Sequence, residues 1–323
     1  HNGDIKKALR LVDIAAEAGA DAIKFQTFKS ESVISAIAEK AEYQKDTTGA
    51  GETMLEMAKK LELSYDEFKT LSAHCEKRNI RFISSPFDLE SAKFLIQMGV
   101  KIVKLGSGEL TNSPLVKYLA NQDVLLVLST GMSHLGEIEE AVSHVQAANR
   151  ASLVLLHCVS SYPAEANSIN LRAMDTMRKA FQIPVGYSDH CMGNEVAFAS
   201  VALGACVLEK HFTESSTQEG PDHAISLEPS ELVALVSGIR RIESALGTGI
   251  KRPHVSELKI RDVARKSIVA KRNLDAGMRL DDSMLEIKRP GTGISPSKLP
   301  ELLGRTLKNS VSRDHLITLE DLN

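Results

Sequence analysis

Two histidines are placed where a pair of imidazoles could bind a metal ion. His190 and His211 each follow an apolar run typical of a buried strand, and no local metal motif has their separation. Two imidazoles that leave other coordination positions open suit a divalent transition ion acting as a Lewis acid. The pair therefore predicts a metal site. In the alternative reading, each imidazole only hydrogen-bonds a neighbouring loop.

Two lysines near the ends of other apolar runs predict an anion site. Lys24 and Lys104 alternate with apolar neighbours, and such alternation directs one set of side chains into a barrel. An inward lysine is costly unless it meets an anion or loses its charge. Hydroxyl and glycine N–H groups can cradle phosphate or carboxylate oxygens. The chain supplies them in Ser84-Ser85, Gly106-Ser107-Gly108, Ser129-Thr130-Gly131 and Ser188.

Further acid–base groups come from two neighbouring segments. Glu209-Lys210-His211 ends the last apolar run, and Asp222 lies in a Gly-Pro loop beyond it. Such a loop could hold a substrate hydroxyl. Taken alone, Asp222 would be only a turn former.

The elements that must position these side chains recur along the chain. Seven apolar runs predict buried strands at 21–27, 80–86, 101–107, 124–130, 152–160, 183–190 and 206–213, and segments with helical spacing lie between most of them. Each run ends in polar residues, as in a parallel (β/α)8 TIM barrel, whose active site lies at the carboxyl ends of its strands. A closed barrel has eight strands, so we expect the first to be missing from this sequence. Residues 30–60 predict a long irregular insertion around Gly49-Ala50-Gly51, either a lid or flexible surface.

The carboxyl-terminal part has a different pattern. We expect the barrel domain at 1–250, a linker at 251–262 and a small, mostly β domain at 263–323 with short strand-like runs between turns. Residues 252–323 carry 14 Lys and Arg against 10 Asp and Glu, a net +4, which leaves −7 for residues 1–251. This basic domain could meet an anionic substrate.

Composition excludes several classes of protein. The net charge of −3 argues against a general nucleic-acid binder, and no apolar stretch is long enough to span a bilayer. The four cysteines have no CxxC spacing and are too few for a disulfide scaffold. We therefore expect a cytoplasmic protein that binds neither nucleic acid nor membrane.

Nine motifs then point to a known family. HNGD, KFQTF, FISSPFD, KLGSGE, LSTGM, LHCVSSYP, GYSDH, LEKHFT and EGPDH follow in this order, and SIVAKRNLDAGMRL and IKRPGTG follow near the end. Together they resemble the sialic acid synthase family, which includes N-acetylneuraminate, legionaminate and pseudaminate synthases. The final stretch resembles the antifreeze-like (SAF) domain attached to those enzymes.

The resemblance implies a reaction and the residues for it. Phosphoenolpyruvate would condense with N-acetylmannosamine to give N-acetylneuraminate and phosphate, with a legionaminate or pseudaminate synthase acting on a diacetamido hexose as the alternative. His190 and His211 would hold the ion, most often Mn²⁺, with Mg²⁺ or Co²⁺ as alternatives. The phosphoenolpyruvate contacts would be Lys24, Ser85, Lys104, Ser107, Ser129 and Ser188. The amino-sugar contacts would be Gln26, Tyr162 and Asp222.

The resemblance also implies a domain-swapped homodimer, in which Arg289 of one subunit enters the barrel of the other. Two departures from the family pattern stand out. A glutamate of the family's first strand falls outside this sequence, and Ser160 stands where some relatives use asparagine to hold phosphoenolpyruvate. Two other functions remain open: a Schiff-base aldolase using Lys24 or Lys104, and a non-catalytic sugar-binding protein.

Overall fold

Seven parallel strands form the sheet that carries the predicted site. The computed structural model describes residues 1–48 and 51–323. The strands pair with one another in chain order. They are β1 (Ala22–Thr27), β2 (Arg81–Pro86), β3 (Ile102–Leu105), β4 (Leu125–Ser129), β5 (Ser152–Cys158), β6 (Val185–Asp189) and β7 (Leu208–Lys210). Each predicted run contains one of these strands, so the prediction of seven parallel strands is confirmed, although the residues of β7 are only half-buried.

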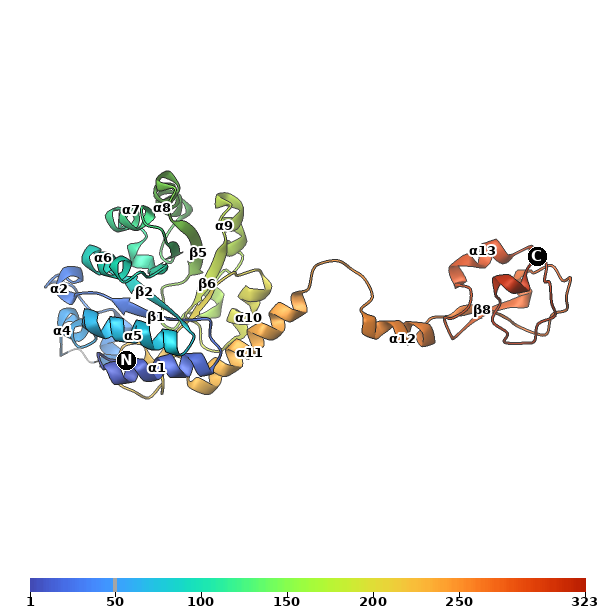
Figure 1. Cartoon of the computed structure of the whole chain (residues 1–323), viewed down its shortest axis with the longest axis horizontal. Helices are drawn as coiled ribbons and strands as arrows, with labels where there is room; N and C mark the ends of the chain where they lie inside the picture. The colour runs from blue at the N-terminus through green and yellow to red at the C-terminus, as the bar shows by residue number, and fades with distance from the viewer. Residues whose placement is uncertain (49–50) are drawn as a thin grey trace. The chain divides into compact units, whose positions relative to one another are not determined.

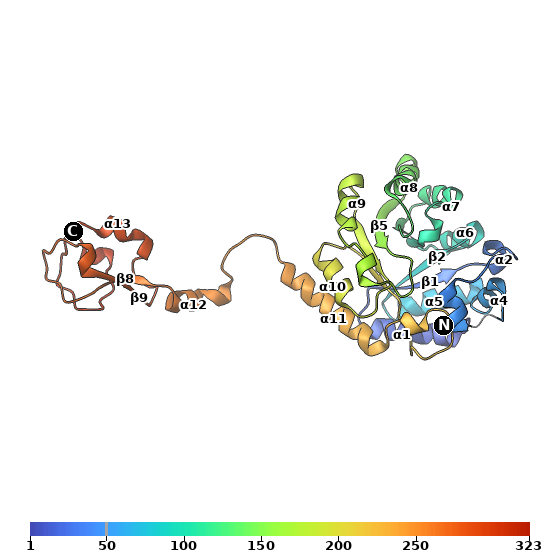
Figure 2. The ribbon, with the colours of Figure 1, turned by 180° about the vertical axis from the view of Figure 1, so that it is seen from behind.

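Helices cover the outside of this curled sheet (Figures 1 and 2). They are α1 (Ile5–Glu17), α5 (Tyr65–Lys77), α6 (Leu89–Gln97), α7 (Ser113–Ala120), α8 (Leu135–Ala148), α9 (Ala173–Phe181), α10 (Glu195–Ala202) and α11 (Pro229–Leu246). Local signals set their ends: the Asp4 side chain accepts from the N–H groups of Lys6 and Lys7, and Gly19 turns the chain with φ +78°. Among the described residues, no helix has both the length and the apolar character needed to cross a membrane.

The sheet is open between its first and last strands. Within the described chain, β1 pairs only with β2, and β7 pairs only with β6. A cavity of about 620 Å³ is lined by residues of both edge strands and by α11. The architecture is therefore an open α/β barrel of seven strands, the number of strands that the sequence predicts.

The segment between β1 and α5 is not the irregular insertion that the sequence predicts. Residues 30–60 contain α2 (Ser30–Val33), α3 (Glu42–Thr48) and α4 (Met54–Lys59). Of the predicted Gly49-Ala50-Gly51 centre, Gly49 and Ala50 lie outside the described residues. Thr53 and Glu56 form a reciprocal capping box at the start of α4. This local signal of a helix start is not visible in the overall composition of the segment.

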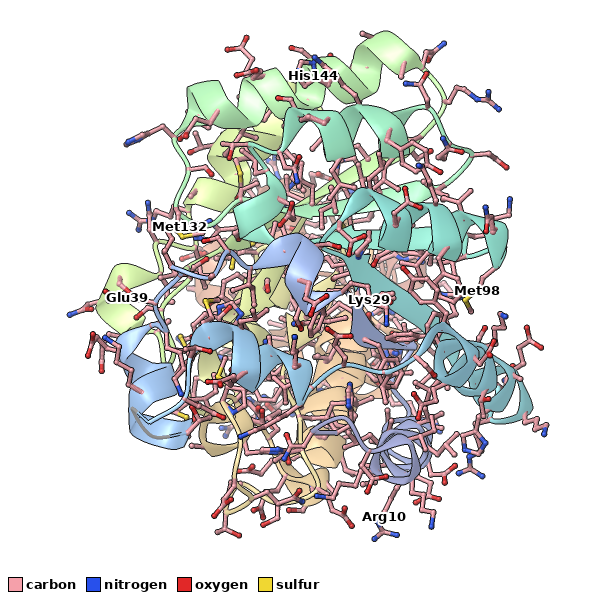
Figure 3. The ribbon with its side chains drawn as sticks, turned by 90° about the vertical axis from the view of Figure 1, so that its left-hand side faces the viewer. Arg10, Lys29, Glu39, Met98, Met132 and His144 are labelled. Atoms are coloured by element: carbon pink, nitrogen blue, oxygen red, sulfur yellow. The ribbon has the colours of Figure 1, made fainter. Side chains whose placement is uncertain are left out.

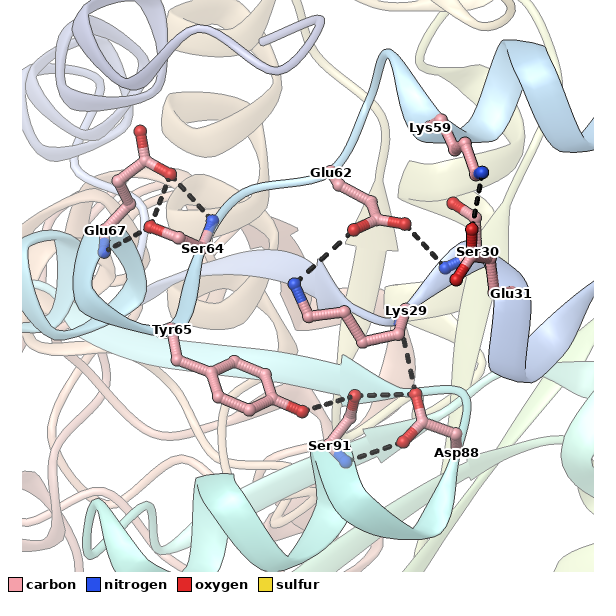
Figure 4. A network of polar contacts seen from close by, with 10 residues as sticks. All are labelled: Lys29, Ser30, Glu31, Lys59, Glu62, Ser64, Tyr65, Glu67, Asp88 and Ser91. Carbon is pink, nitrogen blue, oxygen red and sulfur yellow. Dashed lines mark hydrogen bonds and ion pairs between the residues drawn. The ribbon is translucent and has the colours of Figure 1, made fainter.

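A polar network fastens this segment to the barrel (Figure 4). Glu62 accepts from the Ser30 N–H at 2.6 Å, and its other oxygen lies 3.4 Å from Lys29 Nζ. Asp88, at the start of α6, accepts from the N–H groups of Lys29 and Ser91 at 3.3 and 2.7 Å. These contacts join the segment that follows β1 to the end of β2.

Residues 248–323 form a second compact unit with its own core. It contains α12 (Val255–Ala264), the antiparallel pair β8 (Ser267–Ala270) and β9 (Leu285–Lys288), and the short α13 (Leu299–Leu302). The predicted linker at 251–262 is therefore partly helical. The sequence also has strand-like runs at 278–280 and 307–311, but these form only isolated bridges, because the chain turns too often there for a longer ladder.

Candidate active site

A glutamate between two lysines lies at the centre of the barrel mouth. Glu209 Oε2 is 3.6 Å from Lys24 Nζ, and Glu209 Oε1 is 3.6 Å from Lys104 Nζ. Ser188 Oγ donates to Glu209 Oε1 at 2.9 Å. Burial alone would raise the pKa of Glu209, but the two ammonium groups and Ser188 hold it at about 2. The glutamate is therefore ionised, and its two oxygens hold the ammonium groups of Lys24 and Lys104 close to each other.

Lys104 is the more deeply buried of the two lysines. Its side chain is 4% exposed, and its Nζ also donates to the Leu105 carbonyl at 2.9 Å. Burial lowers the pKa of Lys104 to about 8, with Lys24 acting in the same direction and Glu209 against it. One negative charge thus faces two lysines, which leaves this region suited to a further anion.

Serine hydroxyls and a glycine complete this anion site. Ser85 and Ser129 are buried, and within the described structure their hydroxyls have no hydrogen-bond partner. Ser107 Oγ accepts from the Gly131 N–H at 2.9 Å. A Cβ added at Gly131 would lie 2.4 Å from Ser160 Oγ and 2.7 Å from Ser107 Oγ. Since buried polar groups are ordinarily satisfied, these hydroxyls fit a bound oxyanion.

Replacing Gly131 by alanine is expected to weaken anion binding about tenfold or more, because the methyl group must displace the hydroxyls of Ser107 and Ser160. Gly136→Ala is the matched control, since a Cβ at Gly136 meets open space. Calorimetric titration with inorganic phosphate measures the effect. Phosphate affinity equal to that of Gly136→Ala would show that this cradle does not hold the anion.

The two predicted metal ligands lie beside the anion site. The ring centres of His190 and His211 are 5.4 Å apart. His190 Nδ1 is 2.8 Å from the Val159 carbonyl oxygen, so Nδ1 carries the proton and the Nε2 lone pair is available to a metal. Burial lowers the pKa of His211 to about 3, and the charge of Lys24 acts in the same direction. His211 is therefore neutral, as a metal ligand must be.

The donor set fits an ion with an open coordination sphere. In the part of the chain that the structure describes, no three or more His, Cys, Asp or Glu side chains converge on one metal position. His190 and His211 would therefore hold the ion by themselves, and its other positions would go to water and substrate. Such a set suits a Lewis acid better than a structural metal, which is enclosed by protein ligands.

Two of the three predicted sugar contacts lie beside the histidines. Tyr162 places its ring 4.2 Å from that of His190, and Asp222 Oδ2 is 3.7 Å from His211 Nδ1. Burial raises the pKa of Asp222, although the charges of His190 and Lys24 oppose this. Gln26 is exposed on β1, in register with Ser85 on β2. The structure thus gathers the predicted barrel residues at one mouth.

Two residues do not join them. Lys210, expected among the acid–base groups, points away from the mouth, because side chains alternate along β7 and those of Glu209 and His211 face it. Arg289 lies exposed in the second unit, where its Nε donates to the Ala264 carbonyl, and its role in a partner's barrel stays a prediction. The sequence predicts Glu209 only as an acid–base group, and it does not predict the contact of Glu209 with both lysines. Gly131 was predicted as part of the anion cradle, but its close packing against Ser107 and Ser160 was not.

Comparison with known proteins assigns the family. Residues 11–251 match the NeuB family, and residues 265–323 match the SAF domain. The N,N'-diacetyllegionaminic acid synthase of Campylobacter jejuni is 47% identical, over 98% of this chain and 96% of that protein. The protein of the same name from Legionella pneumophila is 45% identical, over 97% and 89%. The chain belongs to the NeuB family.

A solved structure agrees with this assignment. The sialic acid synthetase of Leptospira borgpetersenii, crystallised with citrate, superimposes with a TM-score of 0.71 at 37% identity, over 80% of this chain and 86% of that one. The predicted family, fold and enzyme class, a nonulosonic acid synthase, are therefore confirmed.

Proposed function

We propose that this protein condenses phosphoenolpyruvate with a diacetamido hexose to give N,N'-diacetyllegionaminic acid and phosphate. The main support for the proposal is the arrangement of side chains at the barrel mouth. Two lysines and two serine hydroxyls without hydrogen-bond partners among the described residues lie there beside two imidazoles. The choice of sugar rests on the 47% and 45% identities to synthases of that name, against 37% to the sialic acid synthetase. N-Acetylmannosamine, the first choice from the sequence, becomes the second candidate.

The anion site suits phosphoenolpyruvate because that substrate carries both a phosphate and a carboxylate. Lys24 and Lys104 would pair with these oxygens, and the hydroxyls of Ser85 and Ser129 would gain the partners they lack. Ser107 and Ser160, held beside Gly131, would form the adjoining wall. Such positioning confines the enol carbon near the histidines.

The reaction forms a carbon–carbon bond and a C2–O bond from water, and it breaks the C2–O bond to phosphate. One proton of the water ends on the former aldehyde oxygen and the other on the released phosphate. The enol carbon of phosphoenolpyruvate attacks the aldehyde carbon of the open-chain sugar, water adds at C2, and phosphate leaves. A divalent ion at His190 and His211, most often Mn²⁺, would supply Lewis-acid polarisation of the aldehyde. Lys24 and Lys104 balance the charge of the departing phosphate, while Glu209 keeps both amines in place.

Gln26, Tyr162 and Asp222 would orient the sugar by its hydroxyl and acetamido groups. The homodimer is part of the proposal, with Arg289 of the partner subunit reaching this sugar site. An exposed guanidinium at the end of β9 is suited to that role. We also propose a cytoplasmic location, because phosphoenolpyruvate is a metabolite of that compartment.

The experiment that tests the proposal supplies phosphoenolpyruvate, Mn²⁺ and one sugar at a time, and follows phosphate release and the 2-keto acid. We expect kcat/KM for the diacetamido hexose to exceed that for N-acetylmannosamine about tenfold or more, the scale set by one well-made polar contact. The reverse preference would make the protein an N-acetylneuraminate synthase. Tight sugar binding without turnover of any sugar would indicate a non-catalytic binder.

A further inference from the structure

An ion pair on the outer face of the sheet lies next to both histidines. The parallel register places Ser188 opposite Glu209 and Asp189 opposite Lys210. Because side chains alternate along a strand, Ser188 and Glu209 face the barrel interior, Asp189 and Lys210 face outward, and the histidines that follow face inward again. Each imidazole therefore follows directly after one member of the outward pair.

This pair is closed to solvent. The side chains of Lys210 and Asp189 are 4% and 0% exposed, and Lys210 Nζ lies 2.7 Å from Asp189 Oδ2. The ammonium also donates to the carbonyl oxygens of Cys191 and Gly193, at 2.5 and 3.0 Å. All three of its N–H groups are thus occupied. Lys210 has no proton or lone pair to offer a substrate, so it is not a catalytic residue.

The other carboxylate oxygen of Asp189 also has hydrogen-bond donors. Its Oδ1 accepts from the Cys191 N–H at 2.9 Å and from the Tyr187 hydroxyl at 3.1 Å. The network therefore holds the backbone on both sides of His190 and at the residue before His211.

We propose that Asp189 and Lys210 are positioning residues that set the separation of the two imidazoles and thereby the affinity of the protein for its divalent ion. This rests on the proposed function, in which His190 and His211 hold the ion. The pair faces away from the barrel interior, in which the two imidazoles lie. It acts by fixing the loop from Cys191 to Gly193 and the end of β7, and supporting contacts behind metal ligands commonly change affinity about 10- to 100-fold.

The test compares Mn²⁺ binding by the wild type and by Lys210→Met, using the electron paramagnetic resonance signal of free Mn²⁺. Lys210→Met keeps the aliphatic stem and removes the ammonium. We expect its Mn²⁺ dissociation constant to rise about 10- to 100-fold. Its affinity for inorganic phosphate should stay within about twofold, because Lys24, Lys104 and the serines are untouched.

Val145→Ala is the matched control for lost stability, since Val145 is buried on α8, away from the mouth. If Lys210→Met does not fold, Asp189→Asn/Lys210→Met replaces it, because that double variant leaves no buried charge without a partner. It should also bind Mn²⁺ more weakly, since the Cys191 and Gly193 carbonyls lose their donor.

Two results would overturn the inference in distinguishable ways. If the wild type binds Mn²⁺ and the Lys210 variants bind it as tightly as Val145→Ala does, the pair has only a structural role and the proposed function stands. If the wild type binds no Mn²⁺, the metal site of the proposed function fails, and this inference fails with it.

Discussion

Replacing His211 by alanine is expected to reduce turnover by about a hundredfold to a thousandfold, the usual effect of removing one group that stabilises developing charge. His211 is neutral and lies 5.4 Å from His190 between ring centres, so its loss leaves a single imidazole for the ion. The remaining activity should not respond to added Mn²⁺. Steady-state kinetics with and without a chelator measure both effects.

His144→Ala is the matched control for this variant. His144 lies on α8, at the periphery of the barrel unit (Figure 3). The same chemical change there should leave turnover within about twofold, as is usual for substitutions away from a site. Unchanged turnover in His211→Ala, or equal losses in the two variants, would contradict the assignment of His211 as a metal ligand.

The barrel was predictable because its signals are local and repeated. Each strand is a short apolar run between helical segments, and the same order recurs seven times, so an error in one run would not change the fold. The segment at 30–60 was not predictable in this way. Its helices are short, and they depend on contacts between residues far apart in the sequence, such as those of Glu62 with Ser30 and of Asp88 with Lys29.

The candidate site was predictable as a set of residues but not as a geometry. Strand alternation placed Lys24 and Lys104 inward, and strand ends placed His190 and His211 at one mouth. The contact between Glu209 and both lysines depends on β7 reaching across to β1 and β3, which no sequence spacing reveals. The role of Gly131 likewise depends on Ser160 and Ser107, which lie on neighbouring loops.

Anion affinity is expected to fall as the pH rises through about 8. Burial and Lys24 lower the pKa of Lys104 to about 8, so its ammonium is present below that pH and is lost above it. Phosphoenolpyruvate gains no further charge there, because the second proton of a phosphate monoester dissociates near pH 6. The dissociation constant for phosphoenolpyruvate should therefore rise about tenfold per pH unit above 8, through proton linkage.

Two variants separate Lys104 from other titrating groups. In Glu209→Gln, the carboxylate that opposes the lowering of the Lys104 pKa is gone, so the loss of affinity should begin at a lower pH. In Lys104→Met, the titrating group itself is gone, so affinity should be weak at every pH and have no step near 8. Calorimetric titration from pH 6.5 to 9.5 measures all three profiles, in roughly half-unit steps. If the loss of affinity near pH 8 persists in Lys104→Met, another group titrates there. If the pH of this loss shifts only in Glu209→Gln, anion binding depends on the contact between Glu209 and Lys104.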